Sequence, residues 1–149
     1  MIFIGFISGV VLTVMAVVYV FRNYMMVAKE LPYDFQTSIS KVENSIKNAG
    51  WGIPTQLDVN QMTAKKGVNL ALKVHIIELC KPQYAKNVLE DSPVFSAMMP
   101  CRIGLFEREG KTYVAKMNTG MMSMLWGGIV GKTMKKVAEE EAAILKTLE

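Results

Sequence analysis

This chain of 149 residues has few of the residue types on which common enzyme chemistry depends. It contains one histidine and two cysteines, and the cysteines do not have the CxxC spacing typical of thiol redox centres. No serine has a histidine and an acid in a recognisable motif around it. Internal repeats and low-complexity tracts are also absent. The residues therefore assign no enzyme class, and whether the protein is an enzyme stays open.

The basic residues are scattered along the chain. Seventeen Lys and Arg residues against thirteen Asp and Glu residues give a net charge of +4. Apart from the small pairs Lys65-Lys66 and Lys135-Lys136, the lysines form no stripe, and aromatic residues do not alternate with them. A nucleic-acid groove needs clustered positive charge, so the sequence predicts no nucleic-acid partner.

The first twenty residues after Met1, from Ile2 to Phe21, carry no charged side chain. A helix of that length spans roughly 30 Å, the hydrocarbon thickness of a bilayer. A cleaved signal peptide and a buried core helix are the alternatives, but no small-residue cleavage site follows the run. The sequence predicts a transmembrane anchor over residues 1–26, a domain over residues 27–149, and single-pass localisation in the cell membrane with the lipid bilayer as a partner. Arg22 and Lys29 favour a cytoplasmic domain.

The remaining chain mixes helical and strand patterns. Asp34 predicts a helix start with Gly50 at its end, and Pro82 suits the first turn of another helix. Leu70, Leu72, Val74 and Ile76 alternate with more polar residues, which predicts a strand with one apolar face. Glu109-Gly110 predicts a hairpin turn, and an amphipathic helix follows Gly127-Gly128. This order predicts an α+β two-layer sandwich with helices on one sheet face. The other face must be solvated, pair with a second subunit, or cover a ligand.

Three segments arrive in the order and spacing of a known family: residues 50–54 (GWGIP), 78–82 (ELCKP) and 98–102 (MMPCR). With Met117-Asn118 and the last helix, residues 27–148 resemble the bacterial and archaeal domain-of-unknown-function 302 family. The resemblance implies a compact α+β domain with a topology similar to the TATA-binding-protein fold, and a homodimer. It implies no activity, and the topology alone implies no DNA binding. Lys81 stands where this family usually has asparagine.

Cys80 and Cys101 are the candidate catalytic residues. Cys80 lies two residues before Pro82, where free N–H groups at a helix start would stabilise a thiolate. Cys101 would then resolve a mixed disulfide if the fold brings the two residues together. The alternative is that both are small buried apolar residues, as free cysteines commonly are.

His75 and several methionines are the candidate cofactor ligands. The strand pattern places His75 on the face opposite Val74 and Ile76, where it would bind haem or copper with a sulfur ligand. The other candidates, all methionines, are Met98, Met99, Met117 and Met121. The alternative is packing, in a dimer contact for the histidine and in an adaptable apolar cavity or a dimer seam for the methionines. The run Glu139-Glu140-Glu141 is interpreted as a solvated helix face.

Together these features predict a membrane-anchored, dimeric domain that binds a small ligand or a partner, including a partner in a membrane complex. The expected site is a cleft between sheet and helices, lined by methionines and near the cysteines. Two alternatives are a thiol redox protein that uses Cys80 with Cys101, and a haem- or copper-binding electron-transfer component that uses His75.

Overall fold

The domain is built on one antiparallel sheet of five strands. The computed structural model describes residues 2–148, with side chains described for residue 7 and residues 9–148. The strand order is β1-β5-β4-β3-β2, and all neighbours run antiparallel. The strands are β1 (Met26–Leu31), β2 (Gln56–Asp58), β3 (Val74–Leu79), β4 (Cys101–Arg108) and β5 (Lys111–Met117). The predicted hairpin at Glu109-Gly110 connects β4 to β5.

Six α-helices and one 3-10 helix, η1, are present within residues 2–148. Their bounds are α1 (Ile2–Tyr24), α2 (Phe35–Asn48), α3 (Val59–Ala64), α4 (Pro82–Asp91), η1 (Pro93–Met98), α5 (Thr119–Leu125) and α6 (Gly128–Lys146). The carboxylate of Asp34 accepts hydrogen bonds from the backbone N–H groups of Gln36 and Thr37 at the start of α2. Pro82 begins α4. The prediction of mixed α and β structure is confirmed.

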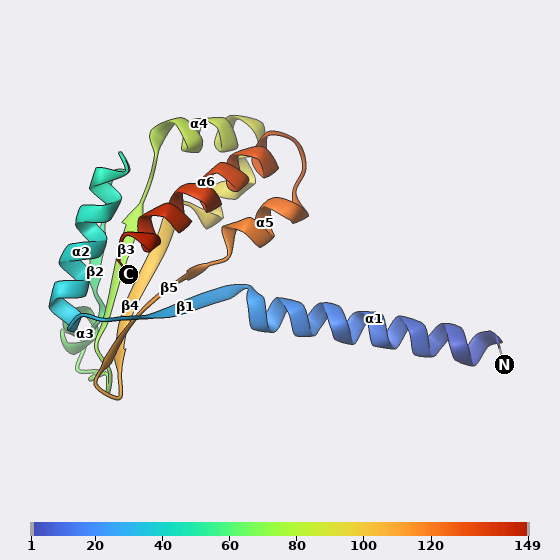
Figure 1. Cartoon of the computed structure of the whole chain (residues 1–149), viewed down its shortest axis with the longest axis horizontal. Helices are drawn as coiled ribbons and strands as arrows, with labels where there is room; N and C mark the ends of the chain where they lie inside the picture. The colour runs from blue at the N-terminus through green and yellow to red at the C-terminus, as the bar shows by residue number, and fades with distance from the viewer. Residues whose placement is uncertain (1, 149) are drawn as a thin grey trace.

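Helices α2 and α6 cover one face of the sheet (Figure 1). Three α2 residues (Ile39, Val42, Ile46) and three from the end of the chain (Val137, Ile144, Leu148) are buried against Ile77, Leu79, Ile103, Leu105 and Val114 of the strands. A second apolar cluster joins Val88 of α4, Phe95 of η1, and Val130 and Met134 of α6. Packing against α6 therefore holds α4 and η1 in place.

The sequence predicted the wrong face of β3 as the buried, apolar one. Leu70 and Leu72 precede the strand, which begins at Val74, so they do not contribute to its alternation. Ile77 and Leu79 are fully buried beneath the helices, whereas Ile76 on the other face is half-buried. Since side chains alternate along a strand, His75 belongs to the helix-covered face and not to the open one.

The first helix projects from the domain (Figure 1). A membrane span requires both length and apolar character in one helix, and no helix within residues 2–148 has enough of both to cross a bilayer. The predicted transmembrane anchor over residues 1–26 is therefore wrong. The single-pass cell-membrane localisation depended on that anchor and is wrong with it, and the orientation drawn from Arg22 and Lys29 loses its basis. The lipid bilayer as a partner stays a prediction.

The turn between α5 and α6 packs without spare room. A Cβ atom added to Gly131 would lie 1.9 Å from the carbonyl oxygen of Trp126, whereas one added to Gly127 would meet nothing within 4 Å. The N–H of Gly131 also donates to the carbonyl of Gly127 at 3.1 Å. The absent side chain of Gly131 thus lets α6 begin directly against the end of α5.

We predict that Gly131→Ala lowers the free energy of unfolding by about 1–3 kcal/mol, because the new methyl group overlaps backbone that cannot rotate away. Urea denaturation followed by circular dichroism measures the change. Gly127→Ala, four residues earlier in the same turn, is the control and should lie within about 0.5 kcal/mol of wild type. Equal stability of the two variants would contradict this packing.

Candidate functional site

A cavity of about 410 Å³ lies at the end of the sheet, beneath α4, η1, α5 and α6. Its lining residues come from both sheet faces: Leu79, Cys101 and Lys116 from the helix-covered face, and Arg102 and Met117 from the open face. The cavity therefore wraps around the strand ends. Six of the twelve methionines line it, namely Met26, Met98, Met99, Met117, Met122 and Met134. It lies where the sequence predicted a methionine-lined cleft near the cysteines.

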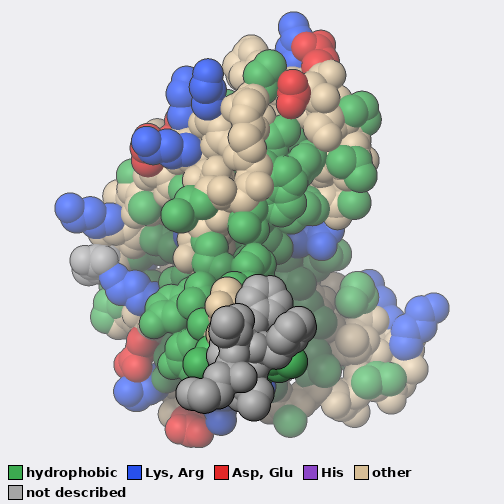
Figure 2. All heavy atoms as spheres, turned by 90° about the vertical axis from the view of Figure 1, so that its right-hand side faces the viewer, with side chains coloured by type: hydrophobic (Ala, Val, Ile, Leu, Met, Phe, Trp, Pro, Cys, Tyr) green, Lys and Arg blue, Asp and Glu red, His purple; other side chains and the backbone are tan. Residues whose placement is uncertain are grey.

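The cavity opens onto an apolar part of the surface. Met26, Met98 and Met117 line the cavity and are also exposed, which places them at its mouth. Other exposed apolar side chains from η1, α5 and α6 include Val94, Leu125 and Ile129. Figure 2 shows apolar side chains gathered on the face from which α1 projects. An apolar molecule would therefore meet apolar surface before it enters.

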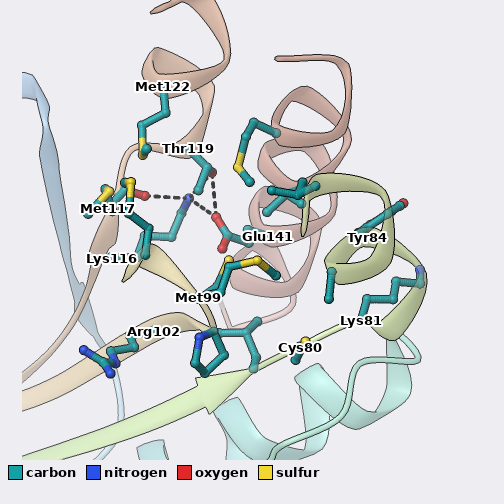
Figure 3. A pocket seen from close by; sticks show the side chains of 18 of the residues that line it. Cys80, Lys81, Tyr84, Met99, Arg102, Lys116, Met117, Thr119, Met122 and Glu141 are labelled. Atoms are coloured by element: carbon teal, nitrogen blue, oxygen red, sulfur yellow. Dashed lines mark hydrogen bonds and ion pairs between the residues drawn. The ribbon is translucent and has the colours of Figure 1, made fainter. Parts of the chain in front are cut away.

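A buried ion pair lies on the cavity wall. The ammonium of Lys116 is 2.7 Å from Oε2 of Glu141, and the hydroxyl of Thr119 donates to the same oxygen at 2.7 Å. The side chain of Glu141 is 2% exposed and that of Lys116 is 12% exposed. Figure 3 shows the three groups converging, with Met99, Met117 and Met122 around them. Burying a charge costs several kcal/mol, which explains why Lys116 and Glu141 are paired. The pair and Thr119 form the main buried polar group in an otherwise apolar cavity wall.

The interpretation of Glu139-Glu140-Glu141 as a solvated face is wrong for two of the three acids. Glu141 lies four residues after Val137 and three before Ile144, both buried, so it falls on the apolar stripe of α6. An acid at such a position is the signal that sequence reasoning missed. Lys116 and Thr119 were missed too, because only the fold brings β5 and the start of α5 to the side of α6.

Glu140 binds a second set of groups at the opposite end of the cavity. Its Oε2 accepts from the indole N–H of Trp51 at 2.7 Å and from the ammonium of Lys81 at 2.9 Å. Its Oε1 accepts from the hydroxyl of Tyr84 at 2.5 Å. Burial raises the pKa of Glu140, but the hydrogen bonds from Tyr84, Lys81 and Trp51 outweigh burial and lower it below its usual value. The network ties α6 to the start of α4 and to the loop before β2.

The predicted cysteine pair does not form. Cys80 and Cys101 both line the cavity, but both are free thiols. Cys101 lies opposite Leu79 in the β3–β4 ladder, and alternation places the next residue, Cys80, on the other face. Burial raises the pKa of Cys80, and burial followed by the charge of Glu141 raises the pKa of Cys101 to about 12. Both thiols stay protonated at neutral pH, which opposes the lowered pKa expected of a nucleophile.

The predicted cofactor ligands are only partly brought together. Met98, Met99 and Met117 line the cavity, whereas His75 and Met121 do not. His75 lies near the β2 edge, where its Nε2 is 2.8 Å from the side-chain oxygen of Gln56. Within residues 2–148, no three His, Cys, Asp or Glu side chains gather around a space for a metal ion. The predicted metal site is therefore wrong, because its histidine lies away from the sulfur atoms.

We predict that Glu141→Leu lowers the free energy of unfolding by about 3–5 kcal/mol, because it leaves the Lys116 ammonium buried without its partner. The double variant Lys116→Met with Glu141→Leu should recover most of this loss, since an apolar pair of similar volume leaves no buried charge. Urea denaturation of both variants measures the difference. A single variant as stable as the double one would contradict a buried ion pair.

We predict that Glu140→Gln lowers the free energy of unfolding by about 1–2 kcal/mol at pH 7, because hydrogen bonds to a charged acceptor are replaced by weaker ones. The folded state lowers the pKa of Glu140, so its contribution is present above the unfolded value of 4.5 and is lost as the pH falls through the folded value. The difference between the proteins should therefore shrink below about pH 4.5. Thermal denaturation at several pH values measures it, and Glu139→Gln, at an exposed neighbour, should lie within about 0.5 kcal/mol of wild type at pH 7.

Comparison with known proteins identifies the domain that carries this site. Residues 27–148 match the family described as "Domain of unknown function DUF302". A crystal structure of an uncharacterised conserved DUF302 protein from Bacillus stearothermophilus is 21% identical, with a TM-score of 0.76 over 84% of this chain and 98% of that one. At this identity the likeness shows the fold alone. No curated protein sequence matches the chain. The family profile covers most of the chain, and the protein belongs to the DUF302 family.

Proposed function

We propose that this domain binds a small, mainly apolar molecule in the cavity at the end of the sheet. The observation that carries the proposal is the combination of an apolar cavity of about 410 Å³ with one buried polar group, Lys116-Glu141-Thr119, on its wall. Ligand sites typically have this composition, in which apolar walls supply affinity and a few polar groups fix orientation.

The methionines support binding over catalysis. Methionine side chains are unbranched and flexible, so a wall built from them adapts to the shape of an apolar guest. The thiols that line the same space are held protonated by burial, which offers no nucleophile for a reaction. The homodimer and the partner protein suggested by the sequence stay predictions beside this one.

The test uses N-phenyl-naphthylamine, a neutral dye that fluoresces in apolar sites. We expect the wild-type chain to bind it and Ala85→Phe to bind it at least about tenfold more weakly, because Ala85 of α4 lines the cavity and the new ring would occupy it. A fluorescence titration measures both affinities. Circular dichroism checks that the variant is folded.

Ala143→Phe is the matched control. Ala143 is exposed on α6 and does not line the cavity, so the same substitution on a helix surface should leave dye binding unchanged. Equal binding by wild type and by folded Ala85→Phe would place the dye elsewhere on the protein. That result would contradict the proposed function.

A further inference from the structure

We infer that the ligand is electrically neutral and that a carbonyl or similar acceptor oxygen of the ligand binds the ammonium of Lys116. This inference rests on the proposed function and names the class of molecule that the cavity would take. It depends on two properties of the lining: which hydrogen-bonding capacity is still open, and how the charges are balanced.

The hydrogen-bonding group that is still open to a ligand is a donor, the ammonium of Lys116. An ammonium has three N–H donors, and that of Lys116 makes one short contact, to Glu141 at 2.7 Å. Its other two contacts, to the carbonyl of Met117 and the hydroxyl of Thr119, are long, at 3.4 and 3.5 Å. An acceptor on a ligand would replace these long contacts with a short one, and hydrogen bonds from a charged donor are among the stronger ones.

One oxygen of the Glu141 carboxylate is already occupied by two short hydrogen bonds. Oε2 of Glu141 accepts from Lys116 and from Thr119, both at 2.7 Å. A ligand that brings an N–H or O–H donor would have to displace one of these two partners to bind Oε2. Lys116, in contrast, can take a ligand acceptor by giving up only its long contacts. The ammonium is therefore the part of the group that a ligand oxygen would bind.

The charges around the cavity are balanced in pairs. Lys116 is paired with Glu141. Lys81 lies 2.9 Å from Glu140, and Arg102 lies 2.9 Å from Glu78. Each cation of the lining thus has an acid beside it, and no positive charge is left for an anionic ligand. A carboxylate or sulfonate bound at Lys116 would add a second negative charge next to buried Glu141, which is unfavourable away from water.

The route from the mouth to Lys116 suits such a molecule. Met26 and Met117 at the mouth belong to the open side of the sheet, Met98 belongs to η1, and the cavity continues around the strand ends to the ion pair. Figure 3 shows Met117 beside the ammonium of Lys116, while the guanidinium of Arg102 points away from it. An apolar body can fill the methionine-lined part while one oxygen reaches the ammonium.

Prodan, a neutral naphthalene with one ketone, tests the inference. Its emission moves to longer wavelength when the ketone accepts a hydrogen bond. The variant Lys116→Met with Glu141→Leu removes the donor and keeps the cavity neutral, and Lys116→Met with Glu141→Met is a second version if the first does not fold. We expect prodan to bind the variant about tenfold or more weakly and with bluer emission, because a charged donor is lost. N-phenyl-naphthylamine, which has no carbonyl, should bind wild type and variant within about twofold.

The outcomes separate this inference from the proposed function. If N-phenyl-naphthylamine binds in the cavity but prodan binds wild type and variant alike, the role of Lys116 is wrong while the cavity remains a binding site. Tighter binding of anilinonaphthalenesulfonate than of its neutral parent N-phenyl-naphthylamine would also overturn the inference, because it would show that the site prefers an anion. If Ala85→Phe binds each dye as tightly as wild type does, the proposed function itself fails.

Discussion

The arrangement of the candidate site depends on two adjacent acids of α6 that bind in different directions. Neighbouring residues on a helix point about 100° apart, so Glu140 and Glu141 contact different parts of the fold. Glu140 accepts from Trp51, Lys81 and Tyr84, and Glu141 accepts from Lys116 and Thr119. The helix is thereby attached to α4 at one end of the cavity and to β5 and α5 at the other.

Asn118 connects the same region to the first helix. Its side-chain oxygen accepts from the N–H of Met121 at the start of α5, while its amide donates to the carbonyl of Tyr24 at the end of α1. Its own backbone N–H donates to the carbonyl of Met25. The residue that begins α5 therefore also fixes where α1 leaves the domain, next to Met26 at the mouth of the cavity. Asn118 thus links the end of α1 to the start of α5 beside the mouth of the cavity.

The cavity explains why the two thiols resemble core residues more than reactive ones. Cys101 is enclosed by the same apolar walls that surround the ion pair, and a thiolate there would lie beside the negative charge of Glu141. Lys116 opposes this effect, but its charge is already committed to Glu141. Desolvation and the neighbouring carboxylate both raise the pKa of the thiol. A site that stabilises one buried charge pair does not accept a third charge.

Local signals in the sequence determined most of the secondary structure and the family. Asp34, Pro82 and the Glu109-Gly110 turn act through contacts within a few residues, so helix starts and the hairpin could be predicted. The order of elements was sufficient to predict an α+β domain. The methionine content was sufficient to predict an apolar cleft. The face of β3 and the short helix α3 could not be predicted, because the limits of an alternating run are set by pairing with other strands.

Only the tertiary structure decided which side chains form the site. Lys116, Thr119 and Glu141 are separated by up to twenty-five residues, and they meet because α6 crosses the end of β5. In the sequence Glu141 is one of three consecutive acids on an amphipathic helix. Its place on the apolar stripe indicates burial, but only the fold shows which partners compensate its charge. Conversely, Cys80 and Cys101 look paired in the sequence, but strand alternation places them on opposite faces. The tertiary arrangement decided these points because burial and charge compensation depend on neighbours that are distant along the chain.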